Sequence, residues 1–164
     1  MRQAVAILVI VVAGLMPAFC ADAEVLTGPA LVIDGDSIVI LGERIHILDV
    51  DAPENAQFCF KKAESLEQGA WHCGQDAAHA LADLIGRQNV TCDTAMRGTH
   101  SGWLARCTVG GEDLARWLAA SGWAVPSHSC KCEIVRSAAG RAKSAQLGIW
   151  SSAFTMPWDW RKAH

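Results

Sequence analysis

Two acidic residues in the first third of the chain, Asp36 and Asp51, have the type and the spacing that could hold a metal ion, and a third acid, Glu54, follows close behind. Asp36 closes the run Asp34-Gly35-Asp36, and 15 residues later Asp51 opens the run Asp51-Ala52-Pro53-Glu54. Carboxylates at the ends of neighbouring strands can meet at one hard cation, which takes oxygen ligands and polarises a phosphoryl oxygen. Taken singly, such acids are more often solvated turn residues, and Asp34 beside Gly35 is predicted to bond nearby backbone amides.

The first 23 residues are predicted to be a signal peptide. Arg2 precedes an apolar run of about 13 residues, and Ala21-Asp22-Ala23 has the form of a signal-peptidase site. The run is shorter than the roughly 20 residues that cross a bilayer, so no permanent membrane span is expected. We therefore expect residues 24–164 to be one exported domain, periplasmic or secreted. Lipid attachment at Cys20 is the alternative, and the bulky Phe19 disfavours it.

Six cysteines remain after that cleavage, an even number that favours disulfides in an exported chain. Cys92 and Cys107 lie on the two arms of a predicted hairpin and could face each other. Cys59 with Cys73 is the next pair, which leaves Cys130 and Cys132 to pair with one another under strain or elsewhere. Their spacing fits no zinc template.

The elements that must position these side chains begin as strands. Residues 31–41 and 44–50 are rich in Ile and Val and flank a short turn at Gly42-Glu43, which predicts a hairpin. Residues 89–95 and 103–109 predict a second hairpin with a Gly- and Ser-containing tip.

Helices are predicted later in the chain. Apolar residues recur at helical spacing over 75–87, 112–121 and 133–147, and Gly122 and Gly148 stand at the ends of the last two. A β-rich first half with helices appended predicts an α+β fold with a small closed barrel.

Four motifs in this order resemble the staphylococcal nuclease (thermonuclease) family over roughly residues 30–150. They are Val32-Ile33-Asp34-Gly35-Asp36-Ser37-Ile38, the stretch from Arg44 to Glu54, Gly122-Trp123-Ala124 and Gly148-Ile149-Trp150. The resemblance implies an OB-type five-stranded β-barrel with three α-helices. It also implies a bound Ca²⁺ and hydrolysis of phosphodiester bonds in DNA and RNA.

The resemblance assigns roles to the acidic residues. Asp36 and Asp51 match the two calcium carboxylates of the family, and Ala52 would supply the third ligand through its backbone carbonyl. Glu54 matches the carboxylate that positions or deprotonates the attacking water.

Two positions depart from the family pattern. The family clamps phosphate with two arginines, and those places hold His46 and Trp103 here. An arginine fork binds two phosphoryl oxygens with a permanent charge. In contrast, His46 offers one donor and a charge only when protonated, and Trp103 offers no cation. Weakened catalysis is therefore expected.

Three other arginines were considered as substitutes for the missing clamps. Arg44 lies on the same strand face as His46 but about 7 Å along the strand, and Arg106 has the opposite parity to Trp103. Arg97, at the base of the second hairpin, is expected to be the best placed of the three.

The charge balance limits how nucleic acid could bind. The 164 residues carry 14 Lys and Arg against 17 Asp and Glu, a net charge of −3, which argues against binding through a broad basic surface. Two functions follow. One is an exported calcium-dependent nuclease with weakened catalysis. The alternative is a non-catalytic accessory protein outside the cytoplasm, for example in exopolysaccharide biosynthesis, with an unknown protein or polymer partner.

Overall fold

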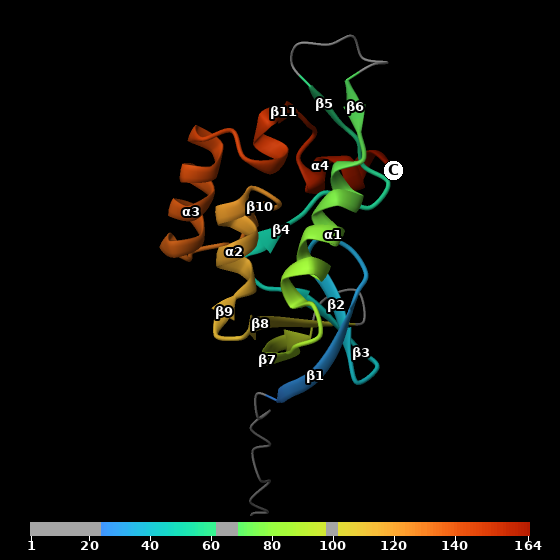
Figure 1. Cartoon of the computed structure of the whole chain (residues 1–164), viewed down its shortest axis with the longest axis vertical. Helices are drawn as coiled ribbons and strands as arrows, with labels where there is room; N and C mark the ends of the chain where they lie inside the picture. The colour runs from blue at the N-terminus through green and yellow to red at the C-terminus, as the bar shows by residue number, and fades with distance from the viewer. Residues whose placement is uncertain (1–23, 62–68, 98–101) are drawn as a thin grey trace, which may run out of the picture.

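The computed structural model describes residues 24–61, 69–97 and 102–164 (Figure 1). The predicted signal peptide with Cys20, and most of the tip of the second predicted hairpin, residues 98–101, lie outside the described residues. In the described ranges no helix has both the length and the apolar character needed to cross a membrane.

A closed barrel of five strands forms the lower part of the molecule in Figure 1. Its strands lie in the order β3-β2-β1-β7-β8, and a parallel pairing of β3 with β8 closes it. Alternate side chains point inward, so Ile38, Ile40 and Ile45 are fully buried. The strands are β1 (Val25–Val32), β2 (Ser37–Ile40), β3 (Glu43–Ile47), β7 (Asn89–Arg97) and β8 (Trp103–Val109).

The prediction of one strand over residues 31–41 was wrong. The chain turns after Val32, and β1 then pairs antiparallel with β2. The turn forms because the Asp36 amide donates to Asp34 Oδ1 at 3.1 Å, while the Ile33 amide donates to the Ser37 carbonyl at 2.9 Å. The local bonding expected of Asp34 is therefore present, and it interrupts the strand.

The predicted second strand, residues 44–50, is also divided. It ends at Ile47, and the chain turns through Asp49, whose φ of 74° is left-handed, before β4 (Val50–Asp51). Pairing of β4 with β10 (Val125–Pro126) then fixes Asp51 at the barrel rim.

In the part of the chain that the structure describes, four α-helices accompany the barrel, one more than predicted. The fold is the expected α+β OB-type barrel. The helix not predicted from the sequence is α4, which follows the last predicted element. The helices are α1 (Cys73–Ile85), α2 (Leu114–Ser121), α3 (Glu133–Ser144) and α4 (Pro157–Ala163). The predicted third helix ends three residues early, and Gly148–Ser151 forms a 3₁₀ turn, η1.

A small second core lies beside the barrel and supports α4. It packs buried Val125 and Ile149 against partly buried aromatic residues, including Trp71 and Trp158. Its sheet has the order β11-β5-β6. These strands are β5 (Cys59–Lys61), β6 (Ala70–Trp71) and β11 (Ser152–Ala153); β9 (Glu112–Asp113) pairs with β8 in the main sheet.

Among the described residues, two disulfides cross-link the fold. Cys92 is joined to Cys107 across β7 and β8, and Cys59 is joined to Cys73 at the start of α1. These are the two pairs expected from the sequence. Cys130 and Cys132 are free thiols, so the pairing left open for them does not form within the described residues.

Candidate functional site

The predicted acidic residues lie in one pocket of about 570 Å³ at the barrel rim. Its walls come from the β1–β2 turn, β3, the segment around β4, and α4. The charged or titratable side chains in the lining are Asp34, Asp36, Arg44, His46, Asp51, Glu54 and Arg161. The chain therefore brings together all three acids that its motifs singled out.

Backbone hydrogen bonds hold the two acidic segments side by side. The Ile47 amide donates to the Asp36 carbonyl at 2.8 Å, and the Ala52 amide donates to Asp36 Oδ2 at 2.9 Å. The second bond ties the Asp36 side chain to the segment that carries Asp51. Ala52 thus contacts Asp36 through its N–H group.

Two glycines allow α1 to pack closely against both acidic segments. A Cβ atom on Gly35 would lie 2.7 Å from the Ala52 side chain and 2.9 Å from that of Ala77. A Cβ atom on Gly74 would collide with the Glu54 carbonyl. Glycine is needed at both positions because the backbones approach too closely for a side chain.

The carboxyl group of Asp36 is electrostatically crowded. Burial raises its pKa well above the ordinary value, and the nearby charges of Asp34 and Asp51 raise it further. Hydrogen bonding from the Ala52 amide acts in the opposite direction and is outweighed. A cation beside Asp36 would relieve this repulsion.

Arg161 on α4 is the cation that meets the acidic cluster. Its Nη1 donates to Asp51 Oδ1 at 2.9 Å and to Glu54 Oε1 at 2.7 Å, while Nη2 donates to Asp51 Oδ2 at 2.7 Å. These bonds, above all those to Asp51, raise the pKa of the guanidinium. Arg161 is therefore permanently charged and held in a bidentate pair.

His46 takes the place of one family arginine and lies in the pocket as a neutral group. Its Nδ1 is 2.8 Å from Ser37 Oγ, and Ser37 is fully buried. Burial, and then the charge of Arg44, lower the pKa of His46. At neutral pH the ring therefore supplies hydrogen bonding without a positive charge.

Trp103, at the other family arginine position, is absent from the pocket lining. Its indole N–H donates to Glu43 Oε2 at 3.1 Å, and the guanidinium of Arg97 lies 4.3 Å from the centre of its ring. Arg97 was expected to be the best placed of the three possible substitutes, but its cation stacks on Trp103 outside the pocket lining, whereas Arg44 does line the pocket.

The other two arginines are also engaged. Arg106 pairs with Asp49 at 3.0 Å and does not line the pocket, as its strand parity predicted. Arg44 does line the pocket and lies 3.5 Å from Asp34.

Sequence reasoning missed Arg161. The available signal was Pro157, which suits the first turn of a helix and precedes Trp158-Asp159-Trp160-Arg161. That pattern could have predicted α4. It could not have shown where the arginine would reach.

The donor chemistry of the pocket fits a hard cation. Asp36 and Asp51 supply carboxylate oxygens, which calcium prefers, and these two residues would hold it. Among the described residues no three His, Cys, Asp or Glu side chains form a ready metal cage. Calcium would therefore also need backbone or water oxygens, and it would share Asp51 with Arg161.

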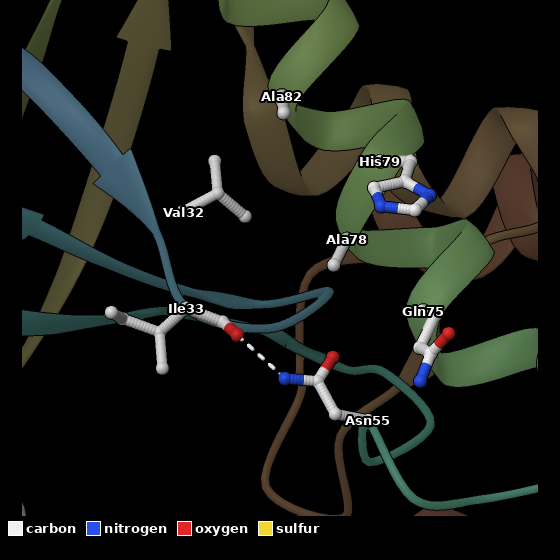
Figure 2. A pocket seen from close by; sticks show the side chains of 7 residues that line it. All are labelled: Val32, Ile33, Asn55, Gln75, Ala78, His79 and Ala82. Atoms are coloured by element: carbon white, nitrogen blue, oxygen red, sulfur yellow. Dashed lines mark hydrogen bonds between the residues drawn. The ribbon is translucent and has the colours of Figure 1, made fainter.

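A second pocket of about 320 Å³ lies between α1 and the end of β1 (Figure 2). Figure 2 shows His79 and Gln75 on α1, and Asn55, whose amide donates to the Ile33 carbonyl at 2.7 Å. This lining contains no carboxylate and no arginine. The acid chemistry of the chain is therefore concentrated in the rim pocket.

Comparisons with known proteins agree with the barrel fold. Residues 44–152 match the family described as staphylococcal nuclease homologue. The chain is 39% identical over 131 residues to the succinoglycan biosynthesis protein ExoI of Rhizobium meliloti (strain 1021), covering 78% of this chain and 66% of that protein. It thus spans just under two thirds of that relative. Over 180 aligned residues it is 27% identical to Protein ParB of Escherichia coli, covering 99% of this chain and 90% of that protein.

Proposed function

The chain belongs to the family of staphylococcal nuclease homologues, and from this premise we propose that its rim pocket cleaves phosphodiester bonds of DNA or RNA with calcium. One observation carries the proposal: Asp36 from one motif converges with Asp51 and Glu54 from the other in a single pocket that also holds a permanent guanidinium. Carboxylates for a hard cation, a carboxylate for a proton and a cation for a phosphate are the parts such a reaction needs.

Each residue has a definite task in this proposal. Asp36 and Asp51 would hold calcium, which when bound supplies positive charge to a phosphoryl oxygen. Glu54 receives Arg161 at Oε1, and its Oε2 is the atom that would accept a proton from the attacking water. His46, held by Ser37, orients the substrate by hydrogen bonding rather than by charge.

The cost of losing two clamping arginines sets the expected activity. An arginine clamp on a transferring phosphoryl group can be worth about 10³ to 10⁵ in rate. His46 is neutral and Trp103 lies outside the lining, so neither position replaces that charge. We therefore infer a slow enzyme. Export of residues 24–164 also belongs to the proposal, and the two disulfides support it because such bonds persist in oxidising compartments.

Variants of the acidic residues test the proposal. We expect the purified chain to cleave single-stranded DNA only with calcium, Asp36→Ala to lose calcium binding in calorimetry, and Glu54→Gln to lower kcat by about 10² to 10⁴. Asp83→Asn, an exposed change on α1, is the control and should leave both unchanged. Calcium affinity and cleavage that survive Asp36→Ala would refute the site.

A non-catalytic accessory role in extracellular polysaccharide production is the second candidate. It is favoured by the similarity to the succinoglycan biosynthesis protein, together with the replaced arginines. Complementation of cells that lack the gene distinguishes the two functions. If Glu54→Gln restores polysaccharide yield as fully as the unchanged chain, the role needs no cleavage; if only the unchanged chain restores it, the accessory role is excluded.

A further inference from the structure

We propose that Arg161 is the group that binds the phosphodiester in the rim pocket, through the guanidinium edge formed by Nε and Nη2. The inference deepens the proposed function and rests on it, because a phosphodiester is the ligand it assigns. It places the substrate-binding charge on α4, beyond the matched residues 44–152.

The hydrogen bonds that Arg161 makes with the described residues leave one complete edge of its guanidinium for a ligand. An arginine has five N–H donors. Asp51 and Glu54 take three, which are both donors of Nη1 and one of Nη2. The remaining two, on Nε and Nη2, point the same way and match the spacing of two oxygens on a phosphate. The side chain is 45% exposed, so a ligand can reach this edge.

The two carboxylates fix the direction of that edge. Asp51 and Glu54 contact Arg161 from two sides, and the Asp51 side chain is only 11% exposed. A fork held in this way loses little freedom when an anion binds, which is the general advantage of a preorganised site. The same contacts place the guanidinium beside the carboxylate that would accept the proton of water.

The backbone of α4 is anchored from behind. The side-chain amide of fully buried Gln57 donates to the Thr155 carbonyl at 2.6 Å, just before α4. The Trp158 ring lies 4.0 Å from the ring of His128 and packs on the second core. Pro157 occupies the first turn of the helix, where its fixed φ is suitable. The helix that carries Arg161 is therefore held in place by contacts on the side away from the pocket.

The other basic side chains among the described residues that line the pocket are less suited to bind the phosphodiester. Arg44 and Arg161 are the only guanidiniums there, and Arg44 is drawn toward Asp34. The lowered pKa of His46 leaves that ring without charge at neutral pH. Of these two guanidiniums, Arg161 is the one that contacts both Asp51 and Glu54.

Nuclear magnetic resonance of the arginine Nε–H groups tests binding without requiring turnover. The probe is a short single-stranded DNA oligonucleotide, added to the full chain with calcium, and the Arg161 signal is assigned by its loss in Arg161→Lys. We expect that signal to shift during the titration, with Arg116 as an internal reference far from the pocket. An Arg161 signal that stays fixed while the oligonucleotide binds would overturn the proposal.

Kinetics of matched variants distinguish two roles for Arg161. Its guanidinium either binds the phosphodiester or only covers the carboxylates of Asp51 and Glu54. We expect Arg161→Gln to weaken oligonucleotide binding at least tenfold and to lower kcat/KM by about 10² to 10³, with little rescue in Arg161→Lys, which lacks the fork. Arg116→Gln is the control, because Arg116 also pairs with a carboxylate and is 49% exposed.

The outcomes distinguish the inference from the proposed function. A shifted Arg161 signal without any cleavage retains the anion-binding role and refutes hydrolysis. Cleavage that Arg161→Gln leaves unchanged or accelerates retains hydrolysis and overturns the role of Arg161, since its guanidinium would then only cover Asp51 and Glu54. Thermal unfolding of each variant checks that a loss is not caused by misfolding.

Discussion

At the scale of single residues, the rim pocket contains a neutral side chain, His46, where the family resemblance implies an arginine. The positive charge of the pocket comes from Arg161 on α4 and from Arg44. His46 is kept neutral by burial and by Arg44, whereas Arg161 is kept charged by Asp51 and Glu54. Two groups that line the same pocket therefore differ in charge at neutral pH, because one is buried beside a cation and the other is paired with two carboxylates. In the proposed function, the histidine would orient the substrate and the arginine would supply the charge.

The lowered pKa of His46 predicts a pH dependence of stability. In the unfolded chain His46 has a pKa near 6.5, so below that pH the unfolded state binds more protons than the folded state. The contribution of His46 to the free energy of unfolding should therefore fall as the pH drops through about 6.5 toward the lower folded pKa, whereas the raised pKa of Asp36 contributes in the opposite direction. Denaturant unfolding from pH 8 to pH 5 measures this loss.

His46→Gln should reduce that loss, since glutamine can still bond to Ser37 but does not titrate. His79→Gln, an exposed change on α1, is the comparison and should retain the wild-type dependence. Equal pH profiles for His46→Gln and the unchanged chain would show that His46 is not the group responsible.

At the scale of elements, the site depends on how closely α1 approaches two loops. Gly35 lies between Ala52 and Ala77, and Gly74 lies against the Glu54 carbonyl. Both contacts join the helix to the segments that carry Asp36, Asp51 and Glu54. The glycine of the Asp-Gly-Asp motif is thus explained by packing as well as by the turn.

Alanine at Gly74 should disturb this packing. We expect Gly74→Ala to lower the free energy of unfolding by about 1–3 kcal/mol, the usual cost of overpacking. Calcium binding should also weaken, because the segment that carries both Asp51 and Glu54 must move. Gly140→Ala in α3 is the control: a Cβ atom there meets nothing within 4 Å, so we expect a gain of about 1 kcal/mol from helix propensity.

Urea unfolding and calcium calorimetry on the two variants make this comparison. A Gly74→Ala protein as stable as the unchanged chain would mean that α1 can retreat without cost, and the proposed tight contact would be wrong.

At the scale of the whole molecule, the net charge of −3 allows only local attraction for a polyanion. With Arg44 and Arg161 as the guanidiniums of the pocket, about two phosphates would be neutralised. Single-strand binding should then show a slope of log affinity against log salt near −1.4, from about −0.7 per phosphate.

Fluorescence titration of a labelled oligonucleotide measures that slope. The salt concentration is varied over roughly 50 to 200 mM, the usual range for such measurements. Arg161→Gln should make the slope shallower by about 0.7, while Arg116→Gln should not change it. A slope as steep as −5 would indicate a broad basic surface that the described residues do not provide.

The sequence by itself determined the features that depend on a few neighbouring residues. Strand and helix periodicity predicted the barrel and three of the helices. The two spaced motifs, through the family resemblance, singled out Asp36, Asp51 and Glu54 as candidate site residues. The hairpin placed Cys92 opposite Cys107 because its arms must pair. The division of residues 31–41 into two strands was missed, since the Ile- and Val-rich pattern continues through a turn that Asp34 closes by a local hydrogen bond.

Only the tertiary structure decided which charge reaches the acidic pocket. Arg161 and Asp51 are 110 positions apart, and their contact depends on α4 being anchored through Gln57 and Trp158. The contacts of Trp103 on β8 also depend on tertiary structure, because its partner Glu43 lies on β3 and its partner Arg97 lies on β7. Periodicity and turn chemistry act over a few residues, whereas an ion pair forms wherever packing brings opposite charges together, and no local pattern encodes that meeting.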